Sequence, residues 1–147
     1  MPLRRLALAA LVAIPAAHAR ADALADRIGQ IPAEVEETRL VGEWTEGTET
    51  GTYRIVVVRT GLQAVRTRLF VQWIVPSEAS FSHKATTEIE EVIELGGDVK
   101  ETTIELADNT LQMTVDLGGS ARTAGQYLVT VEAPGRYSFK KAPPAPQ

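Results

Sequence analysis

Histidine and cysteine, which supply many protein nucleophiles, general bases and zinc ligands, are scarce in this chain. Its 147 residues include no cysteine and two histidines, and one of these, His18, lies in a stretch that we expect to be removed. His83 is then left without a second nitrogen or sulfur ligand, whereas a zinc site needs three or four ligands. We therefore predict no metal site, no catalytic residue and no cofactor, and we interpret His83 as a solvated loop histidine.

Carboxylates are more plentiful, above all between residues 84 and 106. If this segment is a strand, Glu88, Glu90 and Glu94 share one face, and two carboxylates on such a face could cut a glycosidic bond. No aromatic residue lies within this segment to stack on a sugar. Glutamates that alternate with apolar residues are also typical of a strand with one face in water. Glycan cleavage by this row is therefore an alternative function and not the favoured one.

Four arginines form the remaining constellation, and these four lie on one predicted hairpin that holds no acidic residue. Guanidinium groups are planar and carry several donors, so a face that exposes them could bind a carboxylate or another anion. The alternative is that they pair with the glutamates of a neighbouring strand, each exposed pair contributing about 0–1 kcal/mol. The hairpin arginines are Arg54, Arg59, Arg66 and Arg68, and the candidate binding residues are Arg54, Arg66, Arg68, Phe70 and Gln72.

Two longer connections, residues 76–82 and 118–124, are the other surfaces on which we expect function. Loops are exposed and frequently carry binding residues. The first connection, with the histidine that follows it, supplies an alternative binding site composed of Ser80, Phe81 and His83.

Strands are the elements that must position these residues. Apolar and polar residues alternate on either side of Thr60-Gly61, which predicts a long β-hairpin from Tyr53 to Val75. Trp73 shares a strand face with Leu69 and Val71, so we predict that it is a core residue. The connections leave no room for crossover helices, which predicts antiparallel pairing. The eight predicted strands cover residues 39–45, 51–59, 63–75, 84–95, 99–107, 110–117, 125–133 and 136–140.

The segments on either side of the strands differ in composition from the predicted β domain, residues 39–140. Arg4 and Arg5 precede an apolar stretch, residues 6–17, and A-x-A sequences follow it, which predicts a cleaved signal peptide over residues 1–21. Residues 22–38 are expected to form a short helix and a lead-in. Residues 141–147 are rich in proline and are expected to form a disordered tail.

Charge and hydropathy restrict the partners. Removal of residues 1–21 takes away three of the fifteen basic groups and none of the nineteen acidic groups, which leaves a formal net charge of about −7. Nucleic acid is therefore not an expected partner, and no apolar run is long enough to span a membrane. The leader predicts a periplasmic or secreted protein. Without cysteine, the single expected domain depends on its hydrophobic core.

Two architectures fit the strand pattern. An antiparallel β-sandwich of the immunoglobulin-like or jelly-roll-like kind needs about seven or eight short alternating strands, and it is the favoured fold. The alternative is an eight-stranded up-and-down barrel. Gly42-Glu43-Trp44 resembles the G-x-W that opens the first strand of lipocalins and avidin-like barrels, and it follows a predicted N-terminal helix. That resemblance to the calycins implies a closed barrel in which an arginine near the last strand, here Arg136, covers the tryptophan.

The favoured function follows from export and from the missing catalytic residues. We predict an exported, non-enzymatic binding module of the bacterial envelope, which recognises a protein or a glycan through a sheet face or a long loop. The first alternative is a small-molecule carrier with a calycin-like barrel. The second alternative is a glycan-cleaving enzyme that uses the glutamate row.

Overall fold

The computed structural model describes residues 25–78, 80–107 and 110–143. The chain divides into two compact units, Met1–Pro32 and Ala33–Gln147, which are described separately. In the first unit, residues 25–29 form a short α-helix, as predicted. The predicted signal peptide and the last four residues of the predicted tail lie outside the described residues. Across the described part of the chain, no helix combines the length and the apolar character needed to cross a membrane.

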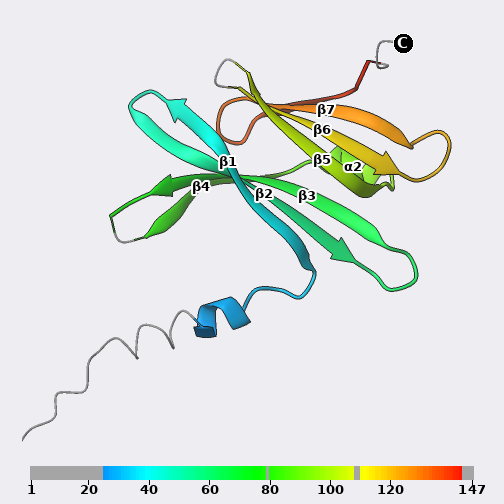
Figure 1. The fold of residues 1–147 in the computed structure, drawn as a ribbon, viewed down its shortest axis with the longest axis horizontal. Coiled ribbons are helices and arrows are strands. Elements are labelled where there is room, and N and C mark those ends of the chain that lie inside the picture. The colour runs from blue at the N-terminus through cyan, green and yellow to red at the C-terminus, as the bar shows by residue number, and fades with distance from the viewer. Residues whose placement is uncertain (1–24, 79, 108–109, 144–147) are drawn as a thin grey trace, which may run out of the picture. The chain divides into compact units, whose positions relative to one another are not determined.

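The second unit contains two antiparallel sheets of four strands each (Figure 1). Strands β1 to β4 form sheet A and β5 to β8 form sheet B, each in sequence order. This confirms the predicted eight-stranded all-β sandwich. The closed barrel is wrong, because the two sheets remain separate. The strands are β1 (Val35–Glu46), β2 (Glu49–Thr60), β3 (Arg66–Pro76), β4 (Phe81–Glu88), β5 (Asp98–Ala107), β6 (Thr110–Gly118), β7 (Gly125–Val131) and β8 (Tyr137–Lys141).

The predicted strand over residues 84–95 is wrong in its second half, because helix α2 (Glu90–Glu94) follows β4. Ile89 and Val92 are both fully buried. Residues three apart point to opposite faces of a strand but to the same face of a helix, so only a helical turn brings both into one core. Gly96 then takes a φ of 60°, the left-handed conformation with which helices commonly end.

The core lies between the inner faces of the two sheets, with α2 contributing to it. Trp73 is fully buried, as predicted, together with Leu69 and Val71. Its ring meets the ring of Tyr53 edge to face, with 6.0 Å between the centroids. The main buried apolar side chains are Trp44, Tyr53, Ile55, Val57, Leu69, Val71 and Trp73 from sheet A, Ile89 and Val92 beside or within α2, and Val99, Leu111, Met113, Val115, Leu117, Tyr127, Val129 and Val131 from sheet B.

The motif Gly42-Glu43-Trp44 lies late in β1 and does not open it, because the strand begins at Val35. Gly42 has a φ of 51° and lies at a shift in the β1–β2 register, so it serves a β-bulge. The cation over the buried Trp44 ring is Lys84, 5.3 Å from the ring centroid. The arginine expected there, Arg136, lies exposed before β8. The structure thus contradicts what the calycin resemblance implied for these residues.

Asp98 connects the two sheets at the start of β5. Its carboxylate accepts hydrogen bonds from Thr67 of β3 at 3.1 Å, from Arg59 of β2 at 2.9 Å and from Lys100 at 2.6 Å. The Thr67 hydroxyl is almost fully buried and also accepts a hydrogen bond from the Val99 amide at 3.3 Å. This network therefore ties β2 and β3 of sheet A to the first strand of sheet B.

The Asp98 network makes stability depend on pH. The hydrogen bond from Lys100, with those from Thr67 and the charge of Arg59, holds the pKa of Asp98 below its ordinary value although partial burial opposes this. A depressed folded pKa stabilises the fold above the unfolded pKa of about 3.9, and this stabilisation disappears as the pH falls through the folded pKa. Asp98→Asn should therefore lower the urea midpoint at neutral pH and have progressively less effect in acid. A difference from wild type that stays constant between neutral pH and about pH 3 would contradict this role.

Candidate functional site

The candidate site lies on the outer face of sheet A, the side that does not contribute to the core. Its side chains come from the residues that alternate with the buried ones along β2 and β3. The strand register aligns Leu40, Arg54, Gln72 and Thr86 in a row across the four strands. A neighbouring row contains Ile74 of β3 opposite His83 of β4. Four different strands therefore contribute to one surface.

Arg54, Gln72 and His83 form a hydrogen-bonded cluster, which we call the Arg54 cluster. The Nε of Arg54 donates to Oε1 of Gln72 at 2.6 Å, and Nη2 lies 2.5 Å from Nε2 of His83. Gln72 donates in turn to the hydroxyl of Thr86 at 3.1 Å. Since a guanidinium can only donate, Nε2 of His83 is the acceptor in this contact. The structure thus joins a residue of the predicted loop site to two residues of the predicted hairpin site.

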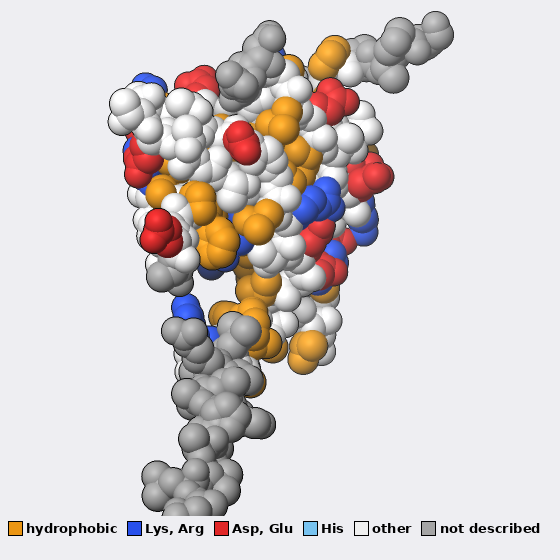
Figure 2. Space-filling model, turned by 60° about the vertical axis from the view of Figure 1, so that its left-hand side comes forward, with side chains coloured by type: hydrophobic (Ala, Val, Ile, Leu, Met, Phe, Trp, Pro, Cys, Tyr) orange, Lys and Arg blue, Asp and Glu red, His pale blue; other side chains and the backbone are white. Residues whose placement is uncertain are grey.

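A groove of about 390 Å³ opens beside the Arg54 cluster. Two of its apolar side chains are unusually exposed, Leu40 at 59% and Phe81 at 71%. Figure 2 shows hydrophobic side chains reaching the surface among polar and backbone atoms. The groove is lined by Thr38, Leu40, Arg54, Ile74 and Phe81. It therefore combines one cationic group with an apolar wall.

The other hairpin arginines lie outside this groove. Arg68 binds both carboxylate oxygens of Glu88 at 2.7 Å and lies 5.0 Å from the centroid of the Phe70 ring. The hydrogen bonds to Glu88 raise the pKa of Arg68 above its ordinary value. Arg59 similarly bridges Glu36 and Asp98. Pairing with carboxylates, the alternative left open by the sequence, therefore holds for these two arginines.

Two further candidates, Arg66 and Ser80, also lie away from the groove lining. Arg66 is exposed at the start of β3, opposite Thr60. Ser80 belongs to the β3–β4 turn, where its carbonyl accepts a hydrogen bond from the amide of Ser77 at 2.8 Å. Of the predicted loop site, only Ser80 lies in the turn, whereas Phe81 and His83 lie in β4, where Phe81 lines the groove and His83 joins the Arg54 cluster. The interpretation of His83 as a loop histidine is therefore wrong.

Leu40 also lines the groove, and it was not among the predicted binding residues. Leu40 is followed directly by Val41, which packs against the core, so apolar side chains emerge on both faces of β1. An exposed leucine on the wet face of a strand was the signal in the sequence that could have identified it. Its position beside Arg54 depends on strand pairing, which the sequence pattern did not show.

The glutamate row predicted for glycan cleavage does not form. Glu88 ends β4 and pairs with Arg68, while Glu90 and Glu94 belong to α2. Glu91 accepts a hydrogen bond from the Tyr137 hydroxyl at 2.8 Å. The pKa of Tyr137 is raised to about 12, mainly by burial of the hydroxyl and in addition by this hydrogen bond. The predicted row is broken between Glu88, which lies in β4, and the pair Glu90 and Glu94, which lie four residues apart in α2 and so share one face of that helix.

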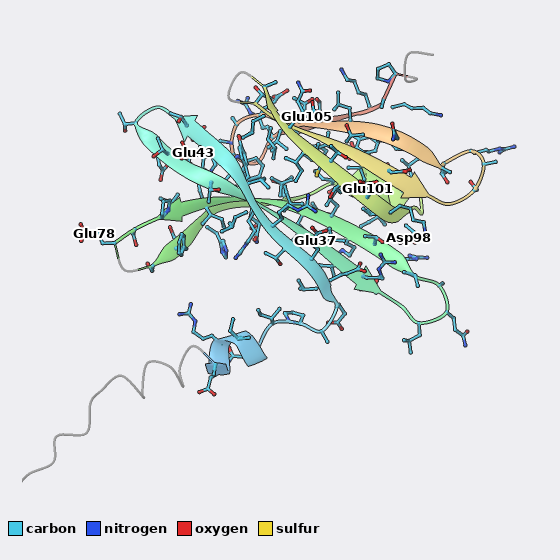
Figure 3. All side chains as sticks on the ribbon, viewed as in Figure 1. Glu37, Glu43, Glu78, Asp98, Glu101 and Glu105 are labelled. Carbon is cyan, nitrogen blue, oxygen red and sulfur yellow. The ribbon has the colours of Figure 1, made fainter. Side chains whose placement is uncertain are left out.

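Acidic residues elsewhere are also dispersed. Glu43 and Glu78 lie far from Asp98, and Glu101 and Glu105 lie along β5 (Figure 3). Within the described residues, no group of three or more His, Cys, Asp or Glu side chains could hold a metal ion.

No protein-family model, curated protein or solved structure matches this chain. The candidate site is therefore defined by its own geometry, with the groove and the Arg54 cluster at its centre.

Proposed function

We propose that this chain is an exported, non-enzymatic binding module of the bacterial envelope, and that the groove beside Arg54 binds an anionic segment of another envelope protein. Export is inferred from the leader-like residues 1–21. A non-enzymatic role is inferred from a sequence with no cysteine and with one histidine after the leader. Neither inference depends on the groove itself.

The observation that carries the proposal is the unneutralised charge of Arg54. Its contacts are with the side chains of Gln72 and His83, neither of which carries a negative charge, and none of the ion pairs among the described residues includes it. Burial lowers the pKa of Arg54, whereas contacts with carboxylates raise the pKa values of Arg59 and Arg68. A partly buried cation has lost part of its solvation, and an anion compensates for that loss more strongly than neutral acceptors do. An anionic ligand is therefore the chemistry that this position favours.

A protein fits the groove better than a glycan does. Leu40 and Phe81 present exposed aliphatic and aromatic carbon beside a single cationic group, and the nearly buried Ile74 also lines the groove. Sugar recognition would require several polar groups directed at hydroxyls, whereas apolar side chains with a few polar groups are typical of sites for less polar ligands. A peptide segment supplies both an apolar side chain and a carboxylate.

Affinity capture with a charge-matched control tests this function. Tagged mature chain is incubated with periplasmic extract as wild type, Arg54→Gln and Arg122→Gln, the last being an exposed arginine in the β6–β7 turn. Each variant removes one positive charge, so non-specific electrostatic retention changes equally. We expect wild type and Arg122→Gln to retain the same protein, and Arg54→Gln to retain it at least about tenfold less tightly, as measured by interferometry with the purified partner.

Three results would contradict the proposal. Equal retention by Arg54→Gln, with its fold verified by circular dichroism, would remove Arg54 from the site. The absence of any saturable protein partner would reject the protein-binding function. A polysaccharide retained through Arg54 in place of a protein would assign the groove to glycan recognition.

A further inference from the structure

We infer that the groove recognises the C-terminal carboxylate of an extended peptide whose last residue is apolar, an inference that rests on the proposed binding function. The carboxylate is expected to contact Arg54, and the last side chain to lie against Leu40, Ile74 and Phe81. Three features of the groove support this assignment, namely its size, the donors that remain on Arg54, and the closeness of the cation to apolar carbon.

The size of the groove suits a chain end. Its volume of about 390 Å³ is at the lower end of the range for small-ligand sites, roughly 300–1,000 Å³. A groove of this size holds one or two side chains and not a folded domain. The ligand that enters it is therefore a short, extended piece of its partner.

Arg54 keeps donors for a carboxylate. A guanidinium carries five N–H donors, of which the contacts with Gln72 and His83 use one on Nε and one on Nη2. Both donors of Nη1 and one donor of Nη2 remain. A carboxylate accepts two parallel hydrogen bonds from such a group, an arrangement that is stronger than a neutral hydrogen bond and more specific. Gln72 and His83 also hold the guanidinium in place, so less side-chain entropy is lost on binding.

The apolar wall distinguishes a chain end from an acidic side chain. Leu40 is the register neighbour of Arg54, and Ile74 is the register neighbour of His83. At a C-terminus, the carboxylate and the last side chain are attached to the same Cα, so they can reach a cation and an apolar wall that lie side by side. An internal Asp or Glu separates its carboxylate from the nearest apolar side chain and brings two further polar peptide groups into the groove, where their desolvation is unfavourable. Capture of a terminal carboxylate is also a known mode of peptide recognition.

Fluorescence anisotropy with matched peptides tests the inference. The probes are N-terminally labelled Gly-Ser-Gly-Ser-Leu as the free acid, the same peptide as the C-terminal amide, Gly-Ser-Gly-Ser-Ser as the free acid, and Gly-Ser-Asp-Ser-Leu as the amide. We expect the leucine-ended free acid to bind at least about tenfold more tightly than either amide and more tightly than the serine-ended acid. Arg54→Gln should abolish the preference for the free acid, and Arg122→Gln should retain it.

The Phe81→Ser variant tests recognition of the last apolar side chain separately from recognition of the carboxylate. Phe81 is 71% exposed, so its replacement should leave the fold intact. We expect this variant to lose the preference for leucine over serine at the chain end and to retain the preference for acid over amide. Retention of the leucine preference would remove Phe81 from the apolar wall and overturn the inference as stated.

Other results of these binding measurements would contradict recognition of a chain end or would separate this inference from the proposed function. Equal binding of free acid and amide, or equal binding of the free acid and the aspartate-containing amide, overturns recognition of a chain terminus. Tighter binding of a labelled uronic-acid oligosaccharide than of any peptide assigns the groove to a glycan. If these peptides fail while a captured protein still depends on Arg54, the inference falls and the proposed function stands. If capture fails as well, both fall.

Discussion

Replacing Trp73 with alanine is expected to lower the free energy of unfolding by about 3–5 kcal/mol, the usual range for emptying a buried aromatic site. The side chain is fully buried and packs edge to face against Tyr53, so its removal takes away apolar burial and an aromatic contact together. A domain of this size has about 5–15 kcal/mol of stability in total, and this one has no disulfide to restrict its unfolded chain. We therefore expect the variant to be largely unfolded or degraded when it is expressed.

Urea unfolding of two further variants, Trp73→Phe and Arg68→Ala, tests whether loss of the buried ring is the cause of this destabilisation. Trp73→Phe keeps a ring against Tyr53 and should cost less than the alanine variant. It also removes the indole Nε1, a buried donor for which the described residues provide no hydrogen-bond partner. Arg68→Ala breaks a partly exposed ion pair on the opposite face of the same strand and should cost no more than about 1 kcal/mol. A Trp73→Ala variant as stable as wild type would mean that this strand face does not form the core.

The second large effect is expected at Gly51, at the start of the buried part of β2. A Cβ atom at this position would lie 2.1 Å from the carbonyl oxygen of Ile74 and 2.6 Å from the Trp44 ring. The nearer atom belongs to the backbone of β3, so a side-chain rotation cannot relieve the clash. We expect Gly51→Ala to cost about 3 kcal/mol, at the upper end of the usual range for overpacking.

The matched control for this substitution is Gly29→Ala. Its Cβ would meet no atom within 4 Å, and the residue lies at the end of the short N-terminal helix. The same change in composition should therefore alter stability by less than about 1 kcal/mol. Thermal unfolding of both variants measures the contrast. Equal midpoints for the two variants would show that sheet A tolerates separation of β2 from β3 at Gly51.

The candidate site could be predicted in part. Arg54 and Gln72 were predicted because guanidinium and amide groups on a two-residue repeat have a clear chemistry, and Phe81 and His83 were predicted because they lie in or directly after a long predicted loop. Their convergence was not predictable. It depends on a shift in the β3–β4 register between Trp73 and Ile74, which places His83, and not Lys84, opposite Ile74. A bulge of this kind changes which side chain faces a neighbouring strand.

The sequence by itself determined the fold class and the buried face of the central hairpin. The alternation of apolar and polar residues along a strand indicates which side chains are buried on folding, and the burial of Trp73 and its neighbours follows from that alternation. The tertiary structure alone decided three things: that β4 gives way to α2, that the sheets stay open, and that Arg68 pairs with Glu88 whereas Arg54 forms no ion pair among the described residues. Each depends on contacts between residues far apart in the chain. A local pattern records the solvent exposure of a side chain, but it does not record which distant strand will lie beside it.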